Sequence, residues 1–149
     1  MKEQFDFRIY KFAQSGKTIL NYKDHSYELG RSFGGLGAVS VAVADMNKDG
    51  INELYYISSW GSGVVRPEVG CFDPVKGEVV TFEYRYLDMM AYFETDNYMF
   101  AVNDGNLEVY TAISENGRSY PDMTAGVVAA KVVYDSGEIK LIEPWDKKE

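Results

Sequence analysis

The chain has 149 residues, which suits a single domain with a hydrophobic core of its own. Its net charge of −8 at pH 7 argues against nucleic-acid binding, which requires a basic footprint, and its single cysteine excludes an internal disulfide and a cysteine-based zinc or iron–sulfur site. No apolar run is long enough to span a membrane, and the 46% hydrophobic and 26% charged fractions are those of an ordinary globular protein.

Short apolar or alternating stretches, separated by turn residues, predict about eleven β-strands and no long helix. The 15% aromatic content supports this, because aromatic side chains favour strands. In chain order, the strands are expected at about 5–10, 18–22, 26–30, 39–44, 54–57, 69–72, 78–86, 98–102, 107–113, 127–134 and 138–142. Residues 87–93 are ambiguous between a strand and a helical turn, and the tail at 145–149 is expected to be frayed.

Turn residues join these strands into hairpins, most clearly at Asn103-Asp104-Gly105-Asn106, because an Asp-Gly pair favours a two-residue hairpin turn. No linker or low-complexity stretch divides the chain. The pattern therefore predicts one all-β domain over residues 1–149, built as a mostly antiparallel meander of short strands.

Side-chain alternation along a strand predicts which residues face the core. Val39, Val41 and Val43 alternate with small residues, so a period of two predicts that all three valines face the core. For the adjacent pair Tyr55 and Tyr56, the same rule predicts one buried and one exposed ring. We interpret these tyrosines as core residues rather than as a sugar-binding platform.

The segment from Asp45 to Glu53, between two predicted strands, has the spacing of a calcium-binding loop. Calcium is a hard cation that takes six to eight oxygen ligands, several of them anionic. Such oxygens recur at alternate positions of the segment: the side chains of Asp45, Asn47, Asp49 and Glu53, and the backbone carbonyl of Ile51. Gly50 permits the sharp turn between them. We therefore predict that these five residues bind one Ca²⁺ ion.

Two other interpretations of this segment were weighed. An EF-hand requires a bidentate glutamate at its twelfth position and flanking helices, but that position is Tyr56 and both flanks resemble strands. An ordinary Asp-Gly hairpin is the second alternative. The turn at 103–106 also contains Asp-Gly but has no spaced carboxylates around it. A hairpin turn therefore does not require the spaced carboxylates that lie between Asp45 and Glu53.

The residues around this loop resemble a known repeat. Phe33-Gly34, followed by Val41-Ala-Val-Ala-Asp45 and the loop through Leu54, is similar to the FG-GAP repeat, the calcium-bearing blade of integrin-α-type β-propellers that also occurs in many bacterial surface proteins. The resemblance covers about residues 33–73 and includes Trp60-Gly-Ser-Gly63, where the family has a Gly-Ala-Pro-like stretch. It implies the same ligands, although the family more often has Asp where this chain has Glu53.

The resemblance also carries an expectation about architecture. A propeller closes with four to eight four-stranded blades, whereas about eleven strands make fewer than three blades. Only one FG-GAP-like repeat is visible in the sequence. We therefore expect propeller-blade-like sheets in an incomplete or partial β-propeller, with a β-sandwich as the alternative.

The function predicted from the sequence is a calcium-stabilised, non-enzymatic binding module for a protein or glycan partner, and no catalytic residue is assigned. One alternative is a glycan-active hydrolase with a carboxylate pair, which 23 acidic residues leave open. Another is a structural portion of a larger propeller or oligomer. The resemblance favours an extracellular or cell-surface location, whereas a true start at Met1 would favour the cytoplasm.

Overall fold

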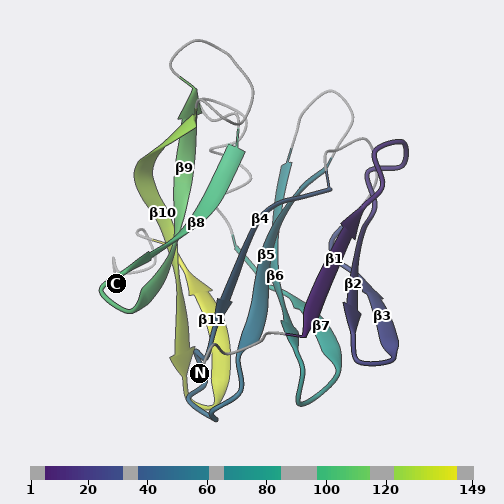
Figure 1. Cartoon of the computed structure of the whole chain (residues 1–149). Coiled ribbons are helices and arrows are strands. Elements are labelled where there is room, and N and C mark those ends of the chain that lie inside the picture. Colours follow the sequence, from purple (N-terminus) through teal and green to yellow (C-terminus); the bar gives the residue numbers. More distant parts are fainter. Residues whose placement is uncertain (1–5, 32–36, 61–65, 85–96, 115–122, 144–149) are drawn as a thin grey trace.

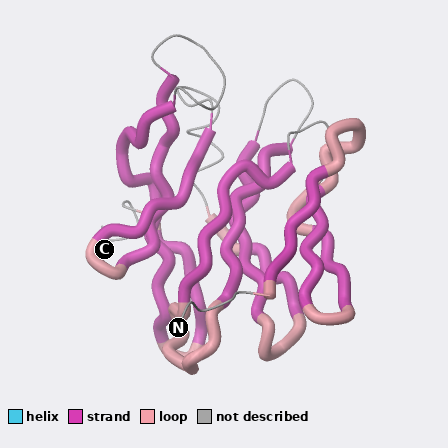
Figure 2. Tube along the Cα trace, in the orientation of Figure 1, coloured by secondary structure: helices cyan, strands magenta, loops and turns pink. Residues whose placement is uncertain are grey.

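A computed structural model describes residues 6–31, 37–60, 66–84, 97–114 and 123–143. Within these ranges the chain forms strands and turns and no helix, so no described helix could cross a membrane. Figure 2 shows the strands joined by loops and turns. The strands are β1 (Phe7–Lys11), β2 (Thr18–Tyr22), β3 (His25–Glu28), β4 (Gly37–Ala44), β5 (Glu53–Trp60), β6 (Arg66–Asp73), β7 (Glu78–Thr81), β8 (Asn97–Asn103), β9 (Asn106–Ser114), β10 (Met123–Asp135) and β11 (Glu138–Ile142). The prediction of an all-β chain with about eleven strands is confirmed for the described residues.

These strands form three antiparallel sheets (Figure 1). The N-terminal sheet has the order β1-β2-β3, the central sheet β4-β5-β6-β7, and the C-terminal sheet β11-β10-β9-β8. Each sheet is a meander, because every strand pairs with its neighbour in sequence, and every pairing is antiparallel. The predicted antiparallel meander is therefore confirmed, divided into three sheets.

The central sheet is covered on both faces. A cluster of buried side chains, here called core one, joins it to the C-terminal sheet: Tyr55, Ile57, Val69, Cys71, Phe82, Tyr98, Phe100, Leu107, Val109, Ala129, Ala130, Val132 and Leu141. A smaller cluster, core two, joins it to the N-terminal sheet: Leu20, Leu29, Leu54, Tyr56 and Phe72. Because side chains alternate across a strand, successive residues of β5 enter opposite cores.

Core two is organised around the ring of Phe72 on β6. One aromatic residue from each strand of the N-terminal sheet contacts it: Phe7, Tyr22 and Tyr27, with ring centroids 6.1, 5.5 and 4.5 Å away. Aromatic pairs at such distances contribute about 0.5–1.5 kcal/mol beyond the area they bury. These contacts hold the N-terminal sheet against the central one.

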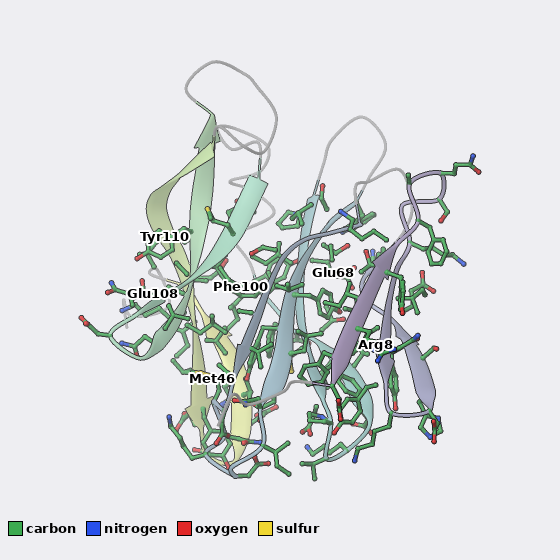
Figure 3. The ribbon with its side chains drawn as sticks, viewed as in Figure 1. Arg8, Met46, Glu68, Phe100, Glu108 and Tyr110 are labelled. Carbon is green, nitrogen blue, oxygen red and sulfur yellow. The ribbon has the colours of Figure 1, made fainter. Side chains whose placement is uncertain are left out.

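Core one is closed by the first strands of two sheets, because β4 and β8 lie against each other. The backbone N–H of Phe100 on β8 donates to the Ser40 hydroxyl on β4 at 2.9 Å. Figure 3 labels Phe100 between the central and C-terminal sheets, and its ring meets that of Tyr55 edge-on at 6.4 Å. The central and C-terminal sheets are thus fixed by a polar contact as well as by apolar packing.

The expectation that three valines of β4 share one core face is wrong. Val39 packs against core one and Val43 against core two, while Val41 is 47% exposed. The pairing of β4 with β5 shifts register between Ala38 and Ser40. Such a β-bulge inserts an extra residue and changes which face the following side chains take.

The expectation that one of Tyr55 and Tyr56 is exposed is also wrong. Both are buried, at 0% and 1% exposure, because Tyr55 enters core one and Tyr56 enters core two. The interpretation of this pair as core residues is confirmed. Burial, together with the nearby Glu68 carboxylate, raises the pKa of Tyr56 to about 12.

Several expectations fall on residues that the structure does not describe. They concern Phe5, Phe33-Gly34, Gly61-Ser-Gly63, the segment 87–93 and the tail 145–149. Where the strand predicted at 78–86 is described, it ends earlier than expected, since β7 stops at Thr81.

Candidate metal centre

The predicted ligands lie in the loop that joins β4 to β5, at one end of the central sheet. The two strands pair antiparallel, as expected, and the last register pair before the loop is Ala44 with Glu53. Asp45 therefore leaves β4 directly beside the residue that begins β5. Figure 3 labels Met46 at this end of β4. The hairpin thus brings the first and last predicted ligands to its base.

Two residues with positive φ turn the backbone inside the loop. Lys48 has a φ of 61° and Gly50 a φ of 88°. A Cβ atom built on Gly50 would meet no atom within 4 Å, so space does not require glycine there. The requirement is conformational, because a side chain at this φ is disfavoured. The sequence prediction for Gly50 is confirmed in this respect.

Side-chain oxygens of the loop accept hydrogen bonds from its own backbone. Asp45 accepts from the N–H of Asp49 at 3.2 Å and, through its other oxygen, from the N–H of Gly50 at 2.9 Å. Asn47 also accepts from Asp49 N–H at 3.2 Å, and Asp49 accepts from Ile51 N–H at 2.8 Å. These bonds curl the loop around the side chains at its alternate positions.

Three carboxylates converge in this loop. Asp45, Asp49 and Glu53 each offer an oxygen, and these oxygens lie within 4.8 Å of one another. Three negative charges at such distances repel each other, and the repulsion grows as water is excluded. A divalent cation placed among them would replace that repulsion with attraction.

Glu53 is the most buried member of the cluster, with 1% of its surface exposed. Its Oε2 accepts two hydrogen bonds, from the backbone N–H of Met46 at 2.9 Å and from the Tyr55 hydroxyl at 3.0 Å. Burial raises the pKa of the Glu53 carboxyl, the two hydrogen bonds oppose that rise, and the charges of Asp45 and Asp49 add to it. The carboxylate form of Glu53 is therefore costly in this loop without a cation.

Tyr55 is a functional candidate that the sequence analysis did not identify. It lies two residues after Glu53 on β5, so both side chains take the same face of the strand. Its ring stacks on Phe82 and meets Phe100 edge-on, both at 6.4 Å between centroids. Burial raises the pKa of the Tyr55 hydroxyl, and the neighbouring Glu53 raises it further. Tyr55 thus connects the acidic loop to core one.

The donor set fits a hard cation. It consists of carboxylate oxygens and the Asn47 amide oxygen, with no imidazole or thiolate among the predicted ligands. Such oxygen-only sets suit Ca²⁺ and Mg²⁺ rather than Zn²⁺. Of the five predicted ligands, the structure brings three carboxylates together and places Asn47 beside Asp49. The Ile51 carbonyl as a ligand stays a prediction.

Buried carboxylates elsewhere in the central sheet have protein partners. Glu68 accepts from the backbone N–H of Arg31 at 3.0 Å and from the Thr81 hydroxyl at 3.3 Å. Asp73 accepts from the N–H groups of Val75 and Lys76, at 2.9 and 3.2 Å, and so closes the β6–β7 turn. These acids have structural roles.

A cavity of about 270 Å³ lies at the N-terminal sheet, lined by Asp6, Arg8, Asn21 and Lys23. It contains one carboxylate, whereas a glycoside hydrolase requires a pair flanking the scissile bond. The hydrolase alternative stays a prediction that these residues do not support.

Comparison with protein-family models, with curated proteins and with solved structures gave no match.

Proposed function

We propose that the protein is a calcium-stabilised β-scaffold that serves as a non-catalytic interaction module for a protein or glycan partner. The observation that carries the proposal is the convergence of three carboxylate oxygens within 4.8 Å at the β4–β5 loop. One of them belongs to Glu53, which has only 1% of its surface exposed and has a raised pKa. The cost of this arrangement is removed when a cation neutralises it.

The ion's role in the proposal is to stabilise the fold. Asp45 follows β4 and Glu53 begins β5, so a shared ion would join the ends of two strands. A ligand that binds only the folded state stabilises it by RT ln(1 + [L]/Kd), which is about 2.7 kcal/mol at a hundredfold excess over Kd. Because core one includes Tyr55 of the same strand, tightening this hairpin would also tighten the central sheet.

The architecture part of the proposal is an incomplete β-propeller. Support comes from the face-to-face packing of three antiparallel sheets and from the contact between β4 and β8, the first strands of two successive sheets. Neighbouring blades of a propeller are related in this manner. Light scattering tests whether several chains complete a ring: a monomer at micromolar concentration supports an open stack of sheets, and a discrete oligomer supports the ring.

Calorimetric titration with CaCl₂ tests the metal site directly. We expect one binding event for the wild type and its loss in Asp49→Ala, because that variant removes a converging carboxylate. Asp104→Ala is the matched control, since Asp104 precedes a glycine in another hairpin turn and lies far along the chain from the acidic loop. Equal heats for the wild type and Asp49→Ala would refute the proposed site.

A further inference from the structure

The N-terminal sheet has an open edge at β1. This sheet has three strands, whereas the central and C-terminal sheets have four each, and among the described residues β1 pairs with β2 alone. The Phe12 N–H donates to the Lys17 carbonyl at 2.9 Å, in continuation of the β1–β2 register. Because backbone groups alternate in direction along an antiparallel strand, every second residue before Phe12 also bonds towards β2. The residues between them direct their N–H and C=O groups to the open edge: Phe7, Ile9 and Lys11.

The β1–β2 hairpin is basic in an acidic chain. Residues 7–23 contain four of the 15 basic side chains and no acidic one, so the other 11 basic residues share the rest of the chain with all 23 acidic residues. All four are exposed, and none forms an ion pair with another described residue: Arg8, Lys11, Lys17 and Lys23. The edge therefore has a positive charge that carboxylates of a partner would complement.

The two faces of β1 differ in chemistry. Phe7 and Ile9 pack against core two but are only partly buried. Arg8 and Tyr10 alternate with them and take the outer face, where Tyr10 is 46% exposed. Opposite side chains of two paired strands lie about 4.5–5.5 Å apart between their Cβ atoms. An added strand would therefore extend core two with apolar residues on one face and meet Arg8 with an acidic residue on the other.

A cavity on the outer face adjoins Arg8. Arg8 pairs across the strands with Asn21, and these two residues line the cavity of about 270 Å³ together with Asp6 and Lys23. Figure 3 labels Arg8 on this sheet. The lining thus has two cationic groups and one carboxylate, which leaves a net positive charge beside the open edge.

We propose that the open edge of β1 binds an extended acidic segment of a partner protein, which adds to the N-terminal sheet as a fourth, antiparallel strand. The segment alternates acidic residues on the outer face with apolar residues that pack on core two. The inference rests on the interaction-module part of the proposed function and is independent of the metal site. A peptide fits this edge better than a glycan does, because it supplies a ladder of N–H and C=O groups at the spacing of a strand.

The charges of β1 distinguish it from other edges and oppose a second copy of this chain. Two paired copies of β1 would bring Arg8 and Lys11 of both chains together, and like charges across paired strands are destabilising. On the edge strand β11, Lys140 Nζ already lies 3.8 Å from Glu138 Oε2. The edge strand β7 begins with the acidic Glu78. The basic edge of β1 thus selects an acidic strand.

The first test titrates a short, capped, fluorescently labelled peptide of alternating valine and glutamate into the full chain in chelator, followed by anisotropy. We expect Arg8→Glu to weaken binding about tenfold, because an opposite-charge pair becomes a like-charge pair. Lys140→Glu is the matched control: it changes the net charge equally, at an exposed position on another edge strand, and should bind as the wild type does. A peptide with lysine in place of glutamate should bind Arg8→Glu more tightly than the wild type. Equal affinities of the wild type and Arg8→Glu for the glutamate peptide would overturn the proposal.

Amide hydrogen exchange followed by NMR tests the strand pairing itself. We expect the N–H groups of Ile9 and Lys11 to gain protection when the peptide binds, and those of Arg8 and Tyr10 to change little, because they already face β2. A peptide N-methylated at alternate residues keeps its charges but loses the donors that face β1, so it should bind about tenfold more weakly or worse. Equal binding of the methylated peptide, or no protection at Ile9 and Lys11, would show attraction by charge alone and would overturn strand addition.

The remaining outcomes identify other occupants and separate this inference from the metal site. A wild type that binds a sulfated oligosaccharide and not the peptide overturns the acidic strand and leaves an interaction module for glycans. A wild-type dimer that the peptide dissociates, measured by light scattering, assigns the edge to a second copy and overturns the choice of partner. Peptide binding by a wild type that does not bind CaCl₂ refutes the proposed metal site and supports this inference.

Discussion

The β4–β5 loop and the β8–β9 turn contain the same Asp-Gly pair but use it differently. Both turn the backbone with residues of positive φ: Lys48 at 61° and Gly50 at 88° in the loop, Asp104 at 50° and Gly105 at 78° in the turn. The turn is a minimal hairpin, since Asn103 pairs directly with Asn106. The loop is longer, because its last paired residues, Ala44 and Glu53, are nine positions apart in the sequence.

The neighbours of the Asp-Gly pair account for the difference. In the loop, Asp45 accepts hydrogen bonds from backbone groups four and five residues later, and Glu53 is held in a buried position by Tyr55. In the turn, the residues from Val102 to Asn106 are all exposed. An Asp-Gly pair therefore indicates only a reversal of the chain. The spacing of oxygen-bearing side chains and the burial of one of them distinguish a candidate metal site.

The largest expected effect compares the residues that begin the two following strands, Glu53 on β5 and Asn106 on β9. Glu53→Ala leaves the part-buried Met46 N–H and the buried Tyr55 hydroxyl without their acceptor, and a buried donor left without a partner costs about 1–3 kcal/mol. It should also abolish the calcium-dependent gain in stability. Asn106→Ala, at an exposed position, should change stability by less than about 0.5 kcal/mol.

Urea unfolding in chelator and in millimolar CaCl₂ measures both parts of this prediction. The free energy of unfolding of Glu53→Ala should be lower than that of the wild type in chelator, and the difference should widen with calcium. Equal losses in Glu53→Ala and Asn106→Ala would mean that the loop is no more than an ordinary turn.

Much of the fold follows from local sequence signals. Alternation and turn residues identify the eleven strands because each strand is short and bounded by residues that favour reversal. The positions of Asp45, Asp49 and Glu53 in one loop were also predictable, because side-chain spacing within a hairpin is a local property. The identity of the ion and of its carbonyl ligand stays a prediction.

The remaining features depend on contacts between distant segments. The bulge at Ala38–Ser40 separates Val39 from Val43, and no residue pattern in β4 marks it. Tyr55 and Tyr56 are both buried because sheets cover both faces of β5, which alternation along one strand cannot reveal. Tyr55 and Glu53 share one face of β5, but alternation does not show that this face is buried, so the sequence analysis did not identify the bond between them.

A smaller effect compares the two glycines. Gly50→Ala and Gly105→Ala each place a side chain at positive φ, where no atom lies within 4 Å of the added Cβ, so the cost is conformational and about 1–2 kcal/mol in each case. Thermal melts in chelator should show similar losses for the two variants. In millimolar calcium, Gly50→Ala should lose more than Gly105→Ala, because it also distorts the ligand loop. A calcium response preserved in full by Gly50→Ala would contradict this.

The smallest expected effect is the pH dependence of the loop, for which Glu53→Gln is the reference variant. Burial raises the pKa of Glu53 in the folded protein above its ordinary value of 4.5. A raised folded-state pKa gives a contribution to stability that is complete below pH 4.5 and is lost as pH rises through the raised value. In chelator, the stability of the wild type relative to Glu53→Gln should therefore fall as pH rises from 4.5 towards 7.

With saturating calcium the trend should reverse, because the ion binds the carboxylate form and competes with the proton. Melting temperatures measured across this pH range with chelator and with calcium give both slopes. The same slope in both conditions would show that Glu53 does not contact the ion.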